Sequence, residues 1–136
     1  MTDGSNITST ITGAGNLTLD GSSTVTGTVG NTTTSLGNIN ANGIAGETVT
    51  FANDVYATNI ENTGTGATTF QANVVATNVN VNAGTSTFQD NLTAATTTIS
   101  TGTGNFNTVS GATTSDLRFT DNGTANLNNG LTGNVT

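Results

Sequence analysis

Two stretches of this sequence repeat each other and decide the fold: Phe51-Ala52-Asn53-Asp54-Val55-Tyr56-Ala57-Thr58-Asn59-Ile60 and Phe70-Gln71-Ala72-Asn73-Val74-Val75-Ala76-Thr77-Asn78-Val79. Each begins with phenylalanine and contains the phrase Val-x-Ala-Thr-Asn, followed by Ile or Val. Phe88 and Phe106 continue the series, and the numbers of the four phenylalanines differ by 19, then 18, then 18. The chain therefore carries an internal repeat.

Other residue types keep fixed distances from the phenylalanines. Alanine comes six residues after each of the five phenylalanines, at Ala57, Ala76, Ala94, Ala112 and, after Phe119, Ala125. Asn or Asp comes three residues after four of them, at Asp54, Asn73, Asn91 and Asn122. A branched aliphatic residue comes four residues after three of them, at Val55, Val74 and Leu92. Constant offsets indicate equivalent places in successive structural units.

The residue types of the repeat favour strands. Thr, Asn, Gly, Ser and Val are poor helix formers, and short alternating runs such as Val25–Val29 and Val79–Val81 are bounded by turn residues. A period near 19 with short strands is typical of a parallel β-solenoid, whose coils stack at about 4.8 Å. We predict an all-β fold: a single β-solenoid segment over residues 1–136, in about seven coils of about 18–20 residues, with the clearest repeats within 48–112.

This fold assigns a place to each repeated residue type. The phenylalanines Phe51, Phe70 and Phe88 should stack inside the coil, and Ala57, Ala76 and Ala94 should form a second file where the coil is narrow. Asn or Asp fits a corner, because both tolerate the left-handed conformation and bond local backbone. Stacked asparagines can also form amide ladders between coils.

The repeat is less regular towards both ends of the chain. Before Phe51, Leu19 and Leu36 are the candidates for the phenylalanine position. After Phe106, the next phenylalanine is Phe119, and this shorter step breaks the period.

The composition excludes several classes of function. Thr, Asn and Gly number 34, 21 and 18 of 136 residues, and the chain has no Lys, His, Cys, Pro or Trp. Histidine acid–base chemistry, cysteine nucleophiles and disulfide scaffolds are thereby excluded. Eight acidic residues against the single base Arg118 give a net charge of −7, which argues against a nucleic-acid partner. The longest apolar run is Val74-Val75-Ala76, so we expect no membrane insertion and, at the N-terminus, no signal peptide.

Three stretches carry a resemblance to a known family. The segment Ile11–Ser23, which reads Ile-Thr-Gly-Ala-Gly-Asn-Leu-Thr-Leu-Asp-Gly-Ser-Ser, is similar to the passenger regions of rickettsial outer-membrane autotransporters, the surface cell antigens. Phe88–Thr93 and Phe119–Ala125 resemble repeats of the same family. The resemblance implies a secreted β-helical passenger, delivered by a C-terminal membrane barrel and used for adhesion. It carries over no adhesive residue.

The acidic residues invite an enzymatic or metal-binding interpretation. Asp116 and Asp121, which flank Arg118, are the sole candidate cluster, but their odd separation would place them on opposite faces of a strand. Ca²⁺ binds carboxylate oxygens and would fit acidic residues that have no basic neighbours. However, the Gly-Gly-x-Gly-x-Asp motif of calcium-binding solenoids is absent. We therefore predict no catalytic residue, no metal site and no cofactor. The glycine pairs Gly13/Gly15, Gly64/Gly66 and Gly102/Gly104 fit turns, because none continues into a nucleotide-binding loop.

Thr-x-Thr pairs suggest a different function, because ladders of such pairs bind ordered water on ice-binding solenoids. Such pairs include those that begin at Thr48, Thr63, Thr85 and Thr101. Measured from the phenylalanine of each repeat, their offsets are −3, +12, −3 and +13, which predicts that they do not form one continuous face.

Three hypotheses of function follow. The leading one is a non-enzymatic structural and adhesive module at the bacterial cell surface, an autotransporter-type passenger segment that binds a receptor on a host or neighbouring cell. The second is a self-assembling fibre or filament subunit, such as a phage fibre shaft or a surface-layer strand. The third is an ice-binding solenoid. We also expect end-to-end self-association, because the edge strands of a solenoid's first and last coils can pair with another chain.

Overall fold

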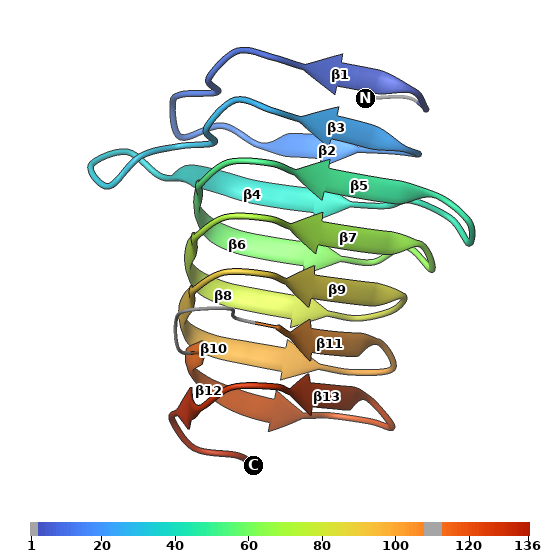
Figure 1. Cartoon of the computed structure of the whole chain (residues 1–136), viewed down its shortest axis with the longest axis vertical. Helices are drawn as coiled ribbons and strands as arrows, with labels where there is room; N and C mark the ends of the chain where they lie inside the picture. The colour runs from blue at the N-terminus through green and yellow to red at the C-terminus, as the bar shows by residue number, and fades with distance from the viewer. Residues whose placement is uncertain (1–2, 108–112) are drawn as a thin grey trace.

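The computed structural model describes residues 3–107 and 113–136, whose regular structure consists of β-strands in two parallel sheets (Figure 1). The odd-strand sheet contains β1 (Ser5–Ile7), β3 (Ser23–Val25), β5 (Thr48–Phe51), β7 (Ala67–Phe70), β9 (Thr85–Phe88), β11 (Thr103–Phe106) and β13 (Thr124–Leu127). The even-strand sheet contains β2 (Leu17–Leu19), β4 (Leu36–Ala41), β6 (Val55–Asn62), β8 (Val74–Val81), β10 (Leu92–Ile99), β12 (Thr113–Phe119) and β14 (Leu131–Thr132).

The chain crosses from one sheet to the other after each strand. Each strand pairs in parallel with the strand two places away in sequence, such as β5 with β7 and β6 with β8. The described strands thus make about six turns, stacked along the long axis with the two termini at opposite ends (Figure 1). This confirms the predicted parallel β-solenoid.

Coil length is regular only in the middle of the chain. Phe51 pairs with Phe70, Phe70 with Phe88, and Phe88 with Phe106, so each predicted step between phenylalanines is one coil. By contrast, Val25 pairs with Phe51, and this coil is longer than those that follow it. The extra residues lie in two loops. In the first, the Asn31 Oδ1 atom accepts the backbone N–H of Thr34 at 2.7 Å. In the second, Glu47 Oε2 accepts the N–H of Ile44 at 2.6 Å.

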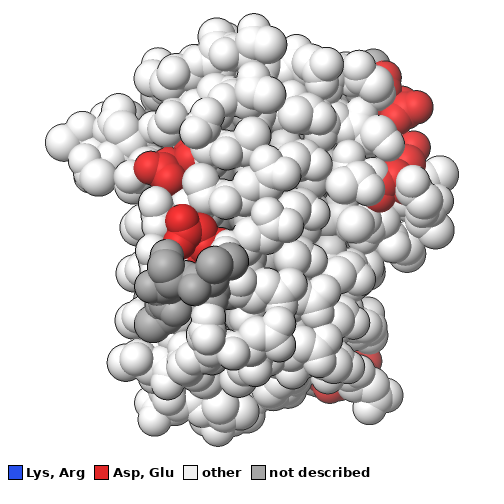
Figure 2. Space-filling model, viewed as in Figure 1, with Lys and Arg blue, Asp and Glu red and all other residues white. Residues whose placement is uncertain are grey.

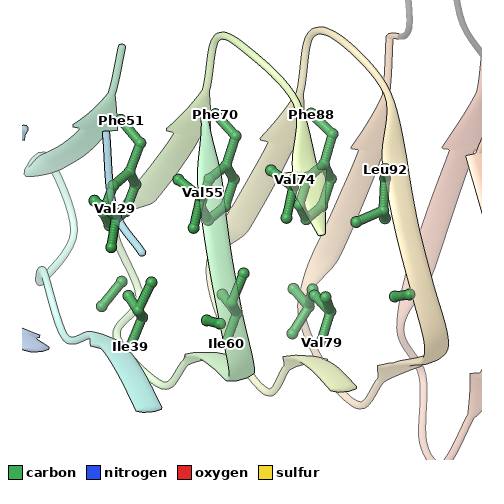
Figure 3. Close-up of a cluster of buried hydrophobic side chains, with 14 of the residues drawn as sticks. Val29, Ile39, Phe51, Val55, Ile60, Phe70, Val74, Val79, Phe88 and Leu92 are labelled. Atoms are coloured by element: carbon green, nitrogen blue, oxygen red, sulfur yellow. The ribbon is translucent and has the colours of Figure 1, made fainter. Parts of the chain in front are cut away.

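The phenylalanines form a continuous stack between the two sheets, as predicted. Neighbouring rings in the series Phe51, Phe70, Phe88 and Phe106 have centroids 5.0, 5.0 and 5.5 Å apart and planes within 8° of parallel. All four side chains are buried. A second apolar file belongs to the same core cluster (Figure 3): Val55, Val74 and Leu92, which begin β6, β8 and β10, and Val29, the partner of Val55. A strand spacing of about 4.8 Å suits the stacking distance of aromatic rings.

The predicted alanine file is also present. Ala57 pairs with Ala76, and Ala76 pairs with Ala94, on the central strands of the even-strand sheet. Ala57 and Ala94 are buried and Ala76 is half-buried. Ala112 lies outside the described residues, and Ala125 pairs with Gly104 in the odd-strand sheet, so it is not a member of this file.

The expectation that Leu19 or Leu36 holds the phenylalanine position was wrong. The phenylalanine file continues instead through Val25, the partner of Phe51, and Ile7, the partner of Val25. Leu19 lies in the even-strand sheet, where Leu36 pairs with Ala57. The two long loops displace this part of the chain from the frame of the central repeats, so counting offsets assigned the wrong residues.

Phe119 likewise lies outside the phenylalanine stack. It pairs with Ile99 in the even-strand sheet, and Leu127 takes the position next to Phe106. The shorter step from Phe106 to Phe119 is therefore a crossing between sheets. Phe119 is followed by alanine six residues later, as the stacked phenylalanines are, so this offset does not indicate the change of sheet.

The corner residues Asp54, Asn73 and Asn91 form the expected side-chain ladder. Asn73 Nδ2 donates to Asp54 Oδ1 at 3.1 Å, and Asn91 Nδ2 donates to Asn73 Oδ1 at 2.8 Å. The expected left-handed backbone is not adopted, because every described residue with positive φ is a glycine. Asn122 does not extend the ladder, because it lies in the turn from β12 to β13, whereas the ladder residues lie in turns that lead from an odd-numbered to an even-numbered strand.

Candidate functional site

The acidic cluster singled out in the sequence is divided between a strand and a turn. Asp116 and Arg118 are exposed on β12, whereas Asp121 follows the end of that strand at Phe119. The argument from opposite strand faces therefore does not apply. Asp116 Oδ1 accepts the backbone N–H of Asn134 at 2.9 Å, and Asp121 Oδ1 accepts the N–H of Asn122 at 2.9 Å. Asp116 thus bonds to backbone 18 residues further along the chain, and Asp121 bonds to the backbone of its own turn.

Within residues 3–107 and 113–136, no group of three or more potential metal-ligating side chains lies together, and no pocket is found. The same residues contain no helix that is long and apolar enough to cross a bilayer. The surface to consider for function is therefore the outside of the two sheets.

Two of the three glycine pairs, Gly64/Gly66 and Gly102/Gly104, lie where the chain is closely packed, whereas an added Cβ at Gly13 or Gly15 would have no neighbour within 4 Å. Gly64 and Gly66 lie in the turn between β6 and β7, while Gly102 precedes β11 and Gly104 lies within it. A Cβ atom at Gly64 would come within 2.1 Å of the Gly43 carbonyl oxygen in the preceding coil. Glycine is required there by the approach of two backbones.

The outer surface of the odd-strand sheet carries two files of small side chains, together called the threonine face. Because alternate residues of a strand point to opposite sides, Val49 and Phe51 of β5 are buried while Thr48 and Thr50 point outwards. The first file contains Thr48, Ala67, Thr85, Thr103 and Thr124. The second file contains Asn6, Thr24, Thr50, Thr69, Thr87, Asn105 and Asn126.

The expectation that the four Thr-x-Thr pairs do not form one continuous face is confirmed. The pairs Thr48/Thr50 and Thr85/Thr87 belong to one continuous surface, and the strand between them contributes Ala67 and Thr69. The Thr-x-Thr motif does not mark this strand, because alanine stands in place of the first threonine. The pair that begins at Thr63 lies in a turn outside this face, and of the pair that begins at Thr101 only Thr103 belongs to the face.

The outer surface of the even-strand sheet has a different chemistry. One of its files runs through Asn40, Glu61, Asn80, Thr98 and Arg118. Another runs through Tyr56, Val75, Thr93 and Thr114. This surface is therefore mixed, with both charge signs, an aromatic residue and the exposed Val75.

Charge is segregated away from the threonine face. None of the seven described strands of the odd-strand sheet contains a charged residue. Most acidic residues lie instead in the turns and loops at the edges of the sheets: Asp3, Asp20, Glu47, Asp54, Asp90 and Asp121. In the view of Figure 2 the acidic side chains lie towards the edges of the molecule, and the broad middle is uncharged.

Comparison of the chain with protein-family models, curated proteins and solved structures finds no match.

Proposed function

We propose that the chain is a non-catalytic structural and adhesive module of an extracellular, autotransporter-type passenger. The observation that carries this proposal is the unbroken parallel pairing of the described strands in both sheets, from β1 to β13 and from β2 to β14. Stacked coils with a shared core form a rigid rod, and a rod displays the same surface chemistry along its length. These are the properties that an extended adhesive segment requires.

The location and partner in this proposal come from the sequence resemblance to rickettsial-type passengers. The module would lie at the bacterial cell surface and bind a receptor on a host or neighbouring cell. With Arg118 as its one basic residue, the chain is poorly suited to nucleic acid, which requires several cationic contacts.

Adhesion can be tested with beads that carry the complete chain. We expect saturable binding of coated beads to cell surfaces and competition by soluble chain. Beads coated with the Phe70→Asp variant provide the matched control. A carboxylate within the ring stack should unfold the chain, although the rest of its sequence is unchanged. Equal adhesion by the two kinds of beads would refute an adhesive role.

The non-catalytic part of the proposal has a separate test. Incubation of the chain with neutral and acidic polysaccharides should release no new reducing or unsaturated ends. Turnover that disappears in Asp116→Asn or Asp121→Asn would contradict it.

A self-assembling fibre subunit is a second candidate, favoured by the strands of the end coils. In the described part of the chain, β1 and β13 each pair with one neighbour in the odd-strand sheet, as do β2 and β14 in the even-strand sheet. A second copy could add to these edges by backbone hydrogen bonds.

A further inference from the structure

The threonine face is a two-dimensional array with a regular repeat. From β5 to β13 each outward residue pairs with the equivalent residue of the next strand without a shift in register. Equivalent groups therefore recur at about 4.8 Å along each file, and the two files are about 6.6 Å apart, the length of two strand residues. The array consists of hydroxyl, methyl and amide groups and carries no charge.

The side chains of this array are held in place before any ligand binds. Thr50, Thr69 and Thr87 are half-buried between their neighbours, and branching at Cβ restricts their χ1 rotation. Further along the second file, Asn105 Nδ2 donates to Thr87 Oγ1 at 3.3 Å, and Asn126 Nδ2 donates to Asn105 Oδ1 at 2.8 Å. Binding therefore loses little side-chain entropy.

The face is poorly suited to a protein partner. Seven strands at about 4.8 Å and four residues at about 3.3 Å give roughly 400 Å², so a face-to-face dimer would bury about 800 Å², below the roughly 1,000 Å² of a stable interface. The two files contain no Trp, Tyr or Arg, the residues that dominate binding energy at protein interfaces. Without charge, the face also has no means of attracting an ionic polymer.

A neutral ligand whose own hydrogen-bonding groups repeat in a lattice matches this face better than a protein or an ionic polymer does. Each hydroxyl gains little free energy by exchanging liquid water for another partner, so binding requires many equivalent contacts formed together. Threonine presents a hydroxyl that bonds to water and a methyl group around which water is ordered. We propose that the threonine face adsorbs to the surface of ice, with its central strands β5, β7 and β9 as the contact region.

The proposal is tested by thermal hysteresis, the gap between the freezing and melting points, and by inhibition of ice recrystallisation. The complete chain should show both activities. Thr69→Lys, in the middle of the face, should reduce thermal hysteresis several-fold, because the longer charged side chain holds neighbouring threonines away from ice. Thr93→Lys is the matched control, since Thr93 is exposed on the central strand β10 of the opposite sheet, and it should keep the activity of the parent chain.

Circular dichroism and thermal melting should show that both variants fold. If Thr69→Lys does not fold, Thr48→Lys takes its place, because Thr48 is at an exposed position of the same face. The proposal is overturned if the parent chain shows neither activity, or if Thr93→Lys reduces activity as much as Thr69→Lys. Dimers lost only in Thr69→Lys would instead assign the face to a second copy. If the parent chain has no ice activity and only Thr69→Lys loses cell adhesion, the threonine face is assigned to the adhesive role. If the parent chain has ice activity but does not adhere to cells, only the adhesive role is refuted.

Discussion

The rings of Phe70 and Phe88 lie parallel, with centroids 5.0 Å apart and an angle of 2° between their planes. Each ring belongs to a different coil, so the contact joins two strands that are not consecutive in sequence. Ring stacking adds to the free energy of burying the aromatic surface. The phenylalanine stack therefore stabilises the register of β5, β7, β9 and β11, which aligns the two files of the threonine face on these strands.

Replacing Phe70 by Ala should lower the free energy of unfolding by about 3–5 kcal/mol, as for other buried aromatic residues. Phe70 loses contacts with both Phe51 and Phe88, and the space between the sheets cannot close without shifting the register. Urea denaturation measures the loss. Val75→Ala, at a position 40% exposed on the outer surface, should change stability by less than about 0.5 kcal/mol; a neutral Phe70→Ala variant would show that the stack is not the core.

The corner ladder should respond differently to two substitutions of Asn73. Asn73→Ala removes a donor to Asp54 and an acceptor for Asn91, so we expect a loss of about 1–3 kcal/mol. Asn73→Asp should be worse at neutral pH, because it places a second carboxylate beside Asp54.

The difference between these two variants should narrow as the pH falls towards about 4, where carboxylates begin to take up protons. The proton neutralises the repulsion in the folded state, so the Asp variant regains stability relative to the Ala variant as the pH is lowered. Denaturation at several pH values measures this difference. A constant difference across the range would show that the two side chains do not interact.

Close packing of the coils predicts a sharp distinction among glycines. Gly84 has φ +60°, and a Cβ atom there would lie 2.2 Å from the Gly66 carbonyl oxygen, so Gly84→Ala combines backbone strain with a clash. We expect a loss of well over about 1 kcal/mol. Gly15→Ala is the control, because its Cβ would have no neighbour within 4 Å and its φ is not left-handed. Equal melting temperatures for the two variants would contradict the coil spacing.

In isolation, the 136-residue chain should associate end to end. The outermost strands β1, β2, β13 and β14 each pair on one side in the described structure, and backbone pairing between copies can complete them. The charge of −7, spread over about six turns, opposes this only weakly, and physiological salt screens it beyond about 8 Å. Light scattering should therefore show association that increases with protein concentration and salt. A monomer throughout both titrations would refute it.

Much of the architecture follows from the sequence between Phe51 and Phe106. There each step from one phenylalanine to the next equals one coil, and each offset from phenylalanine corresponds to one position in the cross-section. The phenylalanine stack, the alanine file and the corner ladder could all be predicted for this reason. Before this region the file of the phenylalanines is occupied by Ile7 and Val25 instead, so residue type alone could not locate it.

The threonine face could not be predicted from the Thr-x-Thr motif. That motif requires Thr at two positions, whereas the surface requires only small uncharged side chains there, which Ala67 and Asn105 also satisfy. The decisive signal was the offset from the buried phenylalanine: the residues one and three positions before it point outwards on every central strand. Because the phenylalanines were already predicted to point inwards, this alternation was present in the sequence, although the Thr-x-Thr motif did not use it.

The stacked register is tested most directly by electron paramagnetic resonance of paired nitroxide labels. The chain has no cysteine, so Cys at Thr69 and Thr87 places the labels only on these neighbouring partners of β7 and β9. With strands about 4.8 Å apart, the account predicts strong spin–spin broadening for this pair. It predicts none for labels at Thr69 and Thr93, which lie on the outer surfaces of opposite sheets. A folded protein in which the Thr69/Thr87 pair shows no broadening would contradict the account.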